Sequence, residues 1–252
     1  MKITQAVCVV TGGASGLGEI TVRMLCLEGA KVAVWDTNQE KGTQLEQELG
    51  VLFCQVDVCS EGSVKQALER TLSVWSQVHV LVNCAGIAIQ ELTFRDSPHS
   101  LDSFKKVLEV NLIGVFNTSR LVAAQMVSQP GYGNTRERGV IINTSSLSAF
   151  EGQRGQVAYS ASKAGVAGLS LPMARDLGRF KVRVATIAPG LFSTPMSDLL
   201  KPQLKEALQK ATSVGRLGYL SEFAHAVKFL IENEYFNGSV LRLDGGMTLP
   251  HL

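Results

Sequence analysis

The chain has 252 residues, of which 45% are hydrophobic and 18% are charged. This composition is too apolar for an intrinsically disordered protein, and the length falls within the range of a single α/β domain. The formal net charge of +2 is close to neutral, so the overall charge does not indicate a nucleic-acid-binding protein. We therefore expect one domain over residues 1–252, and we do not expect nucleic acid as a partner.

The cysteines and histidines form no recognisable metal-binding pattern. The five cysteines contain no C-x-x-C pair and lie mostly in apolar segments, which is typical of buried, reduced thiols. The four histidines are scattered without the spacing of metal ligands. We therefore expect no metal site.

The chain shows no clear membrane or targeting signal. Its apolar runs stop short of membrane-spanning length, so no membrane association is expected. Only Met1 to Gln5 precede the first apolar run, which leaves no room for a cleavable leader. The expected location is therefore the cytoplasm.

The first apolar run leads directly into a glycine-rich turn. Ala6 to Val10 has the pattern of a strand buried on both faces of a parallel sheet, and a predicted helix ends near Glu28. Between them stand Gly12, Gly16 and Gly18. Such a turn lets the backbone approach a pyrophosphate and offers it unpaired N–H groups. The spacing is Gly-x-x-x-Gly-x-Gly, which differs from the usual dinucleotide fingerprint, so a glycine turn without a ligand is the alternative.

Asp36 follows the second predicted strand, Lys31 to Trp35, and lies 18 residues beyond Gly18. A carboxylate at this position can accept hydrogen bonds from the adenosine ribose and would repel a 2′-phosphate, which favours NAD over NADP. The alternative is that Asp36 caps the helix that follows it.

The remaining segments continue the alternation of strands and helices. Strands are predicted over 52–56, 79–82, 140–142, 183–188 and 239–243, and helices over 39–49, 61–75, 101–127, 157–171, 199–211 and 222–233. With the first two strands this gives seven strands and no internal repeat. The sequence therefore predicts an α/β protein, a single-domain Rossmann fold with a doubly wound, seven-stranded parallel sheet.

Small and polar residues stand where several of these strands end. Asn83 to Gly86 follow one predicted strand and Ser146 follows the next, at the edge where open α/β sheets bind ligands. Asn111 lies inside a predicted helix, where its amide competes for backbone hydrogen bonds, and this unfavourable placement indicates a specific task. For Ser146 the alternative is a turn serine that makes only local bonds.

Tyr159 and Lys163 are four residues apart on the helix predicted over 157–171, so their side chains lie on one face. A phenol with a pKa of about 10 is a poor base at neutral pH, and a neighbouring ammonium lowers that pKa effectively only in a partly dry site. The spacing alone is a weak signal, because a packed Tyr beside a solvated Lys gives the same pattern.

Taken together and in order, these motifs resemble those of the short-chain dehydrogenase/reductase family over nearly the whole chain. They are Thr11 to Gly18, Asn83 to Gly86, Asn111, Ser146, Tyr159, Lys163 and Pro189-Gly190. Within the family, the segments 152–153, 158–163, 172–176, 187–192 and 242–244 are most similar to the branch that acts on 3-hydroxyacyl-CoA.

This resemblance implies an NAD-dependent oxidoreductase that transfers a hydride between NAD(H) and a secondary alcohol or ketone, first of all 3-hydroxyacyl-CoA and 3-ketoacyl-CoA. A dehydrogenase of hydroxysteroids or other secondary alcohols is the alternative with the same chemistry. A nicotinamide-binding scaffold or RNA-processing subunit is the alternative of another class. The resemblance also implies a homotetramer, and it leaves the mitochondrial matrix as the alternative location.

The resemblance further implies a role for individual residues. Tyr159 would be the acid/base, Lys163 would lower its pKa and bind the nicotinamide ribose, Ser146 would orient the substrate oxygen, and Asn111 would hold a water in the proton relay. The implied cofactor-binding residues are Gly12, Ser15, Gly16, Leu17, Gly18, Asp36, Asp57, Val58, Asn83, Ala85, Gly86, Tyr159, Lys163, Pro189, Gly190 and Thr194. The implied substrate-binding residues are Ser146, Gln153, Tyr159, Leu191 and Phe192.

Overall fold

The computed structural model of the chain describes residues 1–133, 136–193 and 202–248, without the side chains of 202–205. Within these residues, seven parallel strands form one sheet in the order β3-β2-β1-β4-β5-β6-β7. The strands are β1 (Val7–Thr11), β2 (Lys31–Asp36), β3 (Leu52–Gln55), β4 (Val80–Asn83), β5 (Gly139–Thr144), β6 (Val182–Pro189) and β7 (Val240–Leu243). The predicted α/β fold with a seven-stranded parallel sheet is confirmed.

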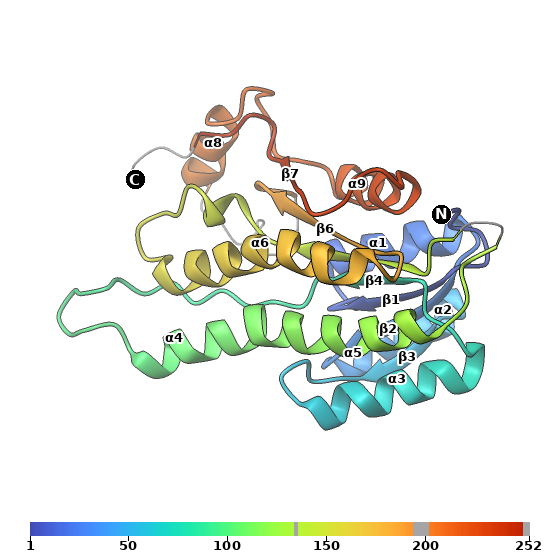
Figure 1. Ribbon diagram of the computed structural model, residues 1–252. Helices are drawn as coiled ribbons and strands as arrows, with labels where there is room; N and C mark the ends of the chain where they lie inside the picture. Colours follow the sequence, from blue (N-terminus) through green and yellow to red (C-terminus); the bar gives the residue numbers. More distant parts are fainter. Residues whose placement is uncertain (134–135, 194–201, 249–252) are drawn as a thin grey trace.

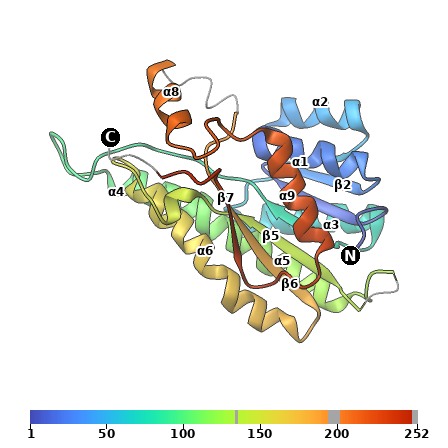
Figure 2. The same ribbon diagram turned by 90° about the horizontal axis from the view of Figure 1, so that it is seen from above.

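Helices cover both faces of this sheet. One layer contains α1 (Gly16–Leu27), α2 (Gln39–Leu49) and α9 (Leu220–Glu232), and the other contains α3 (Glu61–Trp75), α4 (Leu101–Leu108), α5 (Gly114–Ser128) and α6 (Val157–Gly178) (Figures 1 and 2). A π-helical turn, η1 (Glu109–Ile113), joins α4 to α5, a 3₁₀ turn, η2 (Leu147–Ala149), precedes α6, and α8 (Pro202–Lys210) lies between β6 and α9 along the chain.

The two-residue period of the strands divides the core between the two helix layers. In β1, Cys8 and Val10 belong to the cluster that contains Val22 of α1, whereas Val7 and Val9 belong to the cluster that contains residues of α3 and α5. All four β1 side chains are buried, because a parallel strand between two helix layers has no solvent-facing side. Each such burial contributes on the order of 1.5–3 kcal/mol.

The sheet order places the candidate site. The chain leaves β1 toward β2 on one side and returns to β4 on the other side, so the order of the strands reverses between β1 and β4. In open α/β sheets ligands bind outside the carboxyl ends of the strands at this point. The segments that follow β4, β5 and β6 all emerge at this end, which lies on the left of Figure 1.

Two predicted helices differ from the observed ones. The helix predicted over 101–127 is interrupted by η1, in which the Gly114 N–H donates to the Glu109 carbonyl, one residue beyond the α-helical spacing. The helix predicted to end before Pro172 continues to Gly178. Pro172 faces outward, and we attribute the continuation to the burial of Met173 and Ala174 against the sheet, which offsets the lost backbone hydrogen bond.

The joined helix over 101–128 is long and apolar enough to cross a membrane by length and composition alone. This differs from the expectation that no apolar segment reaches such a length. Half of its most apolar window is buried inside the fold, and α5 packs on β4 and β5. We therefore interpret it as a core helix, because a buried helix of a globular fold can be as long and as apolar as a membrane-spanning one.

Candidate functional site

The glycine turn after β1 is closely packed against the segment after β4. Gly12 has a φ of 63°, and a Cβ atom at this position would lie 2.7 Å from the backbone nitrogen of Ala85. A Cβ atom on Gly18 would lie 2.0 Å from the Gly12 carbonyl oxygen. Only glycine therefore fits these two positions, and the backbone itself forms the surface of the turn.

The start of α1 can accommodate an anion. Ser15 is the N-cap residue, but its side chain makes no capping hydrogen bond to the helix. The Ser15 side chain therefore leaves the N–H groups of the first turn of α1, around Leu17, without a cap. These groups also form the positive end of the helix dipole. This arrangement fits the pyrophosphate of a dinucleotide.

Asp36 lies at the end of β2 beside this turn. One carboxylate oxygen accepts a hydrogen bond from the Ala14 N–H at 3.0 Å, and the other accepts one from the Asn38 N–H at 2.9 Å. The N-cap of α2 is Asn38, whose side chain accepts from the Lys41 N–H at 3.0 Å. The alternative in which Asp36 caps α2 is therefore wrong, and the carboxylate keeps further acceptor positions at the cofactor edge.

Asp57 and Val58 follow β3 at the same end of the sheet. Asp57 is exposed, and its carboxylate accepts from the Cys59 N–H at 2.9 Å. Val58 is buried, and its carbonyl accepts from the Asn117 side chain at 2.9 Å. A Cβ atom on Gly114 would lie 2.6 Å from the Val58 side chain, so the first turn of α5 fixes this loop.

Asn83 points into the protein. Its amide nitrogen donates to the Ser119 hydroxyl and to the Asn143 side-chain oxygen, both at 2.9 Å, and its oxygen accepts from the Thr118 hydroxyl at 2.8 Å. Both side-chain N–H groups are thus used to join β4 to α5 and β5. A cofactor contact at Asn83 would therefore have to come from its backbone. Ala85 is held in turn by its N–H, which donates to the Thr11 hydroxyl at 3.3 Å.

Lys163 is buried next to Tyr159, and 5% of its surface is exposed. Its ammonium donates to the Thr144 carbonyl oxygen at 2.9 Å and lies 5.6 Å from the centroid of the Tyr159 ring. The Lys163 carbonyl accepts from the Ser145 hydroxyl at 2.7 Å, so the end of β5 holds both the backbone and the side chain of this residue. The predicted pairing of Tyr159 and Lys163 on one helix face is present.

The thiol beside this ammonium stays neutral at physiological pH. Burial raises the pKa of Cys84 to about 11, although a hydrogen bond with Thr144 and the charge of Lys163 act in the opposite direction. A thiolate at this position would partly neutralise the charge of Lys163. A neutral thiol does not offset the positive charge of Lys163.

Ser146 stands at the start of η2. Its hydroxyl oxygen accepts from the Ser148 N–H at 3.1 Å, and 9% of the residue is exposed. This local bond is the one expected of a turn serine, but it uses a lone pair of the oxygen. The hydroxyl hydrogen can therefore still be donated to a substrate oxygen.

Asn111 is fully buried in the π-helical turn. Its oxygen accepts from the Ile87 N–H at 2.8 Å, and its nitrogen donates to the Ile87 carbonyl at 2.8 Å and to the Ser162 hydroxyl at 3.1 Å. Ser162 donates to the Tyr159 carbonyl at 2.7 Å. The side chain thus ties the segment after β4 to the helix that carries Tyr159. The predicted water contact of Asn111 stays a prediction, and its side chain offers only an oxygen lone pair for it.

Gly86 completes this group. A Cβ atom on Gly86 would lie 3.2 Å from the Asn111 side-chain oxygen and 3.5 Å from the Lys163 ammonium. The structure therefore brings three separately predicted residues into direct proximity, although they come from a loop, a π-helical turn and a helix.

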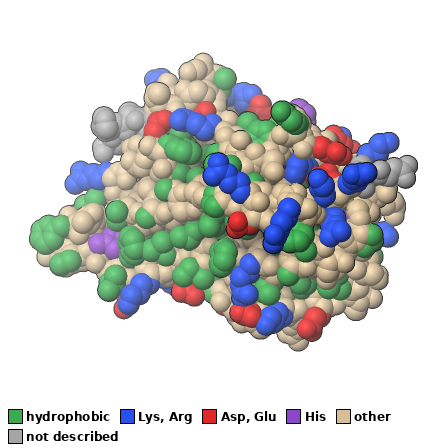
Figure 3. Space-filling model, in the orientation of Figure 1, with side chains coloured by type: hydrophobic (Ala, Val, Ile, Leu, Met, Phe, Trp, Pro, Cys, Tyr) green, Lys and Arg blue, Asp and Glu red, His purple; other side chains and the backbone are tan. Residues whose placement is uncertain are grey.

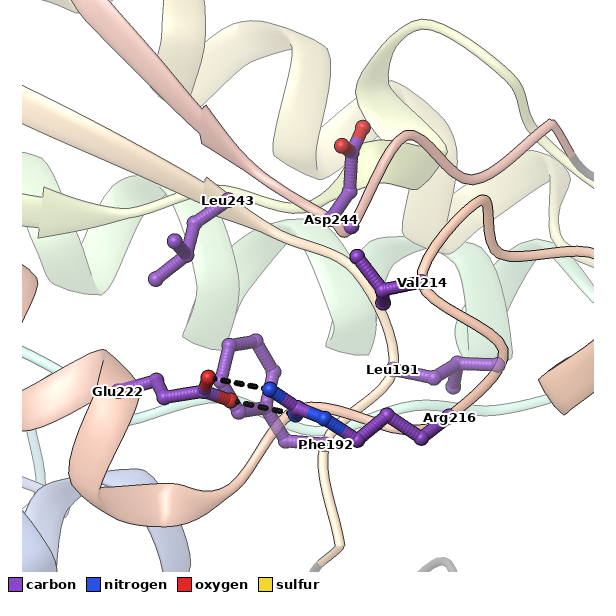
Figure 4. Close-up of a pocket in the computed structure, with 9 residues that line it drawn as sticks. Leu191, Phe192, Val214, Arg216, Glu222, Leu243 and Asp244 are labelled. Carbon is purple, nitrogen blue, oxygen red and sulfur yellow. Dashed lines mark hydrogen bonds and ion pairs between the residues drawn. The ribbon is translucent and has the colours of Figure 1, made fainter.

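The predicted substrate residues after β6 are only partly available. Leu191 is half-buried and lines a cavity of about 130 Å³, together with Phe192, Val214, Leu243 and the ion pair of Arg216 with Glu222 (Figure 4). Phe192 is 6% exposed and packs edge-on against the Phe223 ring. Most of the Phe192 ring belongs to the hydrophobic core, so only its remaining surface at the cavity can meet a substrate, and the predicted substrate contact of Phe192 stays a prediction.

The other predicted residues differ in how far the structure places them. Gln153 is half-buried in the loop before α6. The Gly190 N–H, directly after Pro189, donates to the Leu243 carbonyl at 2.9 Å, which fixes the start of the loop after β6. Thr194 lies outside the described residues.

The described residues contain no group of three His, Cys, Asp or Glu side chains that could hold a metal ion. All five cysteines are free thiols.

Sequence reasoning missed the residues that hold Tyr159 and Lys163 in place. Thr144, Ser145 and Ser162 contact Lys163 and Tyr159 directly, as described above. Ser145 precedes the predicted Ser146, and Ser162 lies three residues after Tyr159, so the sequence shows both serines next to predicted site residues. The sequence does not show which groups they bind, because this depends on how α6 packs on β5.

Comparisons with known proteins agree with this geometry. A family model described as short chain dehydrogenase matches residues 6–205. The chain is 44% identical over 254 residues to the 3-hydroxyacyl-CoA dehydrogenase type-2 of Drosophila melanogaster, with 98% of this chain and 99% of that protein covered. It is 34% identical over 256 residues to the 3-oxoacyl-(acyl-carrier-protein) reductase of Thermotoga maritima, with 99% and 100% covered.

The fold has a close counterpart among solved structures. The crystal structure of 3-hydroxyacyl-CoA dehydrogenase type-2 from Mycobacterium avium superimposes with a TM-score of 0.92 at 37% sequence identity, and the match covers 99% of this chain and 98% of that chain.

Replacement of Asn111 by Leu tests the anchor between the segment after β4 and α6. The variant keeps a similar volume but leaves the two backbone groups of Ile87 without their partner, so we expect the free energy of unfolding to fall by about 2 kcal/mol. Denaturant unfolding measures this change. Ser162→Ala is the graded control, because it removes only one of the bonds to Asn111, and we expect about half the loss. An Asn111→Leu variant as stable as the parent chain would contradict the anchor.

Proposed function

Because the chain belongs to the short-chain dehydrogenase family and is therefore a nicotinamide-dependent oxidoreductase, we propose that its cofactor is NAD and its substrate a 3-hydroxyacyl-CoA. The main observation in support of proton transfer by Tyr159 is the buried ammonium of Lys163 beside the Tyr159 ring. The names of the most similar relatives support the substrate.

The residues around the glycine turn fit a dinucleotide. The backbone surface at Gly12 and Gly18 and the uncapped start of α1 suit a pyrophosphate. Asp36 stands at the end of β2, where its carboxylate would accept hydrogen bonds from the ribose hydroxyls. A 2′-phosphate at that point would face a like charge, so Asp36 supports NAD over NADP.

Proton transfer is the task of the chain's own residues. In alcohol oxidation the Tyr159 phenolate takes the proton of the substrate hydroxyl, and in ketone reduction the Tyr159 hydroxyl donates this proton to the substrate oxygen. The Lys163 ammonium stabilises the negative charge that develops on the phenol, because it is buried and held toward the ring by the Thr144 carbonyl. The Ser146 hydroxyl donates its hydrogen to the substrate oxygen. A bound nicotinamide supplies the hydride acceptor or donor.

Two groups of relatives support acyl thioesters as substrates. One is named for 3-hydroxyacyl-CoA and the other for 3-oxoacyl groups on the acyl-carrier protein. Both names describe oxidation or reduction at the third carbon of an acyl chain. The higher identity to the first group, 44% against 34%, favours the CoA ester.

Turnover of acetoacetyl-CoA with NADH tests this proposal, and absorbance of the reduced nicotinamide is the measurement. The Tyr159→Phe variant should lose at least about 100-fold in turnover, the low end of a general acid/base contribution. It should still bind NADH, because only the hydroxyl is removed. Wild-type turnover in this variant would contradict the role of Tyr159 in proton transfer.

A panel of secondary alcohols separates the substrate from the mechanism. Good turnover of a hydroxysteroid without turnover of acetoacetyl-CoA would favour the alternative function, a hydroxysteroid dehydrogenase that uses the same catalytic residues. No turnover of any alcohol with NAD or NADP would favour the nicotinamide-binding scaffold.

The choice of cofactor rests on Asp36. We expect NADH to be preferred over NADPH by at least about 10-fold in kcat/KM, since one unit of charge repulsion near the surface is worth on the order of 1 kcal/mol or more. Asp36→Asn removes the charge and keeps the size, so it should narrow this preference. Steady-state kinetics with both cofactors give the ratio. An unchanged ratio in the variant would contradict the role of Asp36.

We also propose that the chain forms a homotetramer. Apolar side chains are exposed over the face formed by α4, α5 and α6, where Figure 3 shows a band of hydrophobic residues. The exposed large hydrophobic residues of α4, η1, α5 and α6 are Leu101, Ile113, Phe116, Val157 and Leu171, which are 44–63% exposed. An apolar patch of this kind marks a protein–protein contact more often than a free surface.

Light scattering coupled to size exclusion measures the assembly, and we expect the mass of four chains. Phe116→Glu places a charge in the apolar band and should shift the protein toward smaller species. Leu27→Glu is the matched control, because Leu27 is 89% exposed on α1 in the opposite helix layer. A monomeric parent protein would refute the tetramer.

A further inference from the structure

One guanidinium group joins two loops at the carboxyl end of the sheet. Arg242, in β7, donates to the Asp244 carboxylate at 2.7 Å and 2.9 Å and to the Glu151 carboxylate at 2.9 Å. Glu151 is 91 residues away in the chain. The guanidinium also lies 5.8 Å from the centroid of the Phe150 ring. Neither the motifs nor the proposed mechanism gives this residue a role.

The two carboxylates belong to segments that follow different strands, Glu151 after β5 and Asp244 after β7. Glu151 lies in the loop between Ser146 and α6, the helix that carries Tyr159. A shift of Glu151 would therefore change the distance between the Ser146 and Tyr159 side chains. Asp244 packs directly against the loop after β6. A Cβ atom on Gly190 would lie 2.9 Å from the Asp244 Cα atom.

The charges explain why an arginine is needed here. Glu151 and Asp244 share one guanidinium, so without it the two carboxylates would repel each other at short range. The Asp244 side chain is 10% exposed and the Glu151 side chain 31%, so water screens this repulsion only in part. The hydrogen bonds that Arg242 donates to Asp244 and then to Glu151 raise the pKa of Arg242, and the group stays charged.

We propose that Arg242 is a positioning residue that fixes the Ser146 loop against the end of β7, on which Gly190 after β6 packs, and thereby sets the distance between the proton-transfer residues and the nicotinamide-binding edge. The inference rests on the proposed dehydrogenase function. It adds a residue that touches neither Tyr159 nor Lys163 and acts through the two loops.

Arg242→Gln removes the charge and keeps most of the side chain, and Arg242→Lys restores the charge between the two carboxylates. With acetoacetyl-CoA and NADH, we expect Arg242→Gln to lower kcat about 10-fold, since a small misplacement of catalytic groups has effects of this size or larger. Arg242→Lys should recover kcat to within about 3-fold of the parent value. Circular dichroism confirms that each variant is folded.

Arg23→Gln is the matched control. Arg23 also bridges two carboxylates, those of Glu19 and Glu48, and its side chain is 33% exposed, but it lies on α1 outside the catalytic loops. We expect kcat of this variant to equal that of the parent chain. An equal loss in both glutamine variants would reduce Arg242 to a general stabilising residue and overturn the proposal.

Hydrogen exchange tests the positioning without any turnover. Arg242→Gln should speed amide exchange in 145–156 and 189–191 and leave β1 and α1 unchanged. Unchanged exchange in both loops would overturn the proposal even if the enzyme is active. A parent chain inactive on acetoacetyl-CoA would refute the substrate but leave this exchange result to decide the role of Arg242.

Discussion

The candidate site depends on a buried ammonium held by a backbone carbonyl. Lys163 is 5% exposed and binds the carbonyl oxygen of Thr144, the last residue of β5, at 2.9 Å. A charge in so dry a place is costly unless it is hydrogen-bonded, and the same low polarity strengthens its effect on a nearby phenol. The neighbouring thiol of Cys84 remains protonated, because its pKa is raised to about 11. The thiol therefore leaves the positive charge beside the Tyr159 ring, 5.6 Å from its centroid, without compensation.

The position of this ammonium requires that α6 does not move relative to the sheet. Three hydroxyl or amide side chains provide the attachment. Ser145 binds the backbone of Lys163 from β5, and Ser162 links the Tyr159 carbonyl to Asn111 in the π-helical turn. Asn111 in turn holds Ile87 after β4. The π-helical turn between α4 and α5 places the Asn111 side-chain amide where the backbone of Ile87, after β4, binds it.

A second network of buried polar groups supports the same edge of the sheet. Asn83 joins β4 to β5 through Asn143 and to α5 through Ser119 and Thr118. The side-chain oxygen and nitrogen of Asn83 both find partners here, which makes the strand ends rigid, although the buried side-chain nitrogen of Asn143 makes no hydrogen bond within the described residues. Arg242 connects the loop after β5, through Glu151, with the end of β7, through Asp244, at the surface of the site. The site is thus built from rigid strand ends and from loops tied to one another.

The sequence by itself determined the features that depend on local periodicity. The apolar runs predicted the strands, the four-residue spacing put Tyr159 and Lys163 on one helix face, and the glycine turn predicted a close backbone approach, which the structure shows at Gly12 and Gly18. Only the tertiary structure decided which way Asn83 points, that Phe192 belongs mostly to the core, and that Arg242 meets Glu151. The side-chain contacts of Asn83 and the contact of Arg242 with Glu151 involve partners 35 to 91 residues away in the chain, and neither helical nor strand periodicity carries information over such a separation.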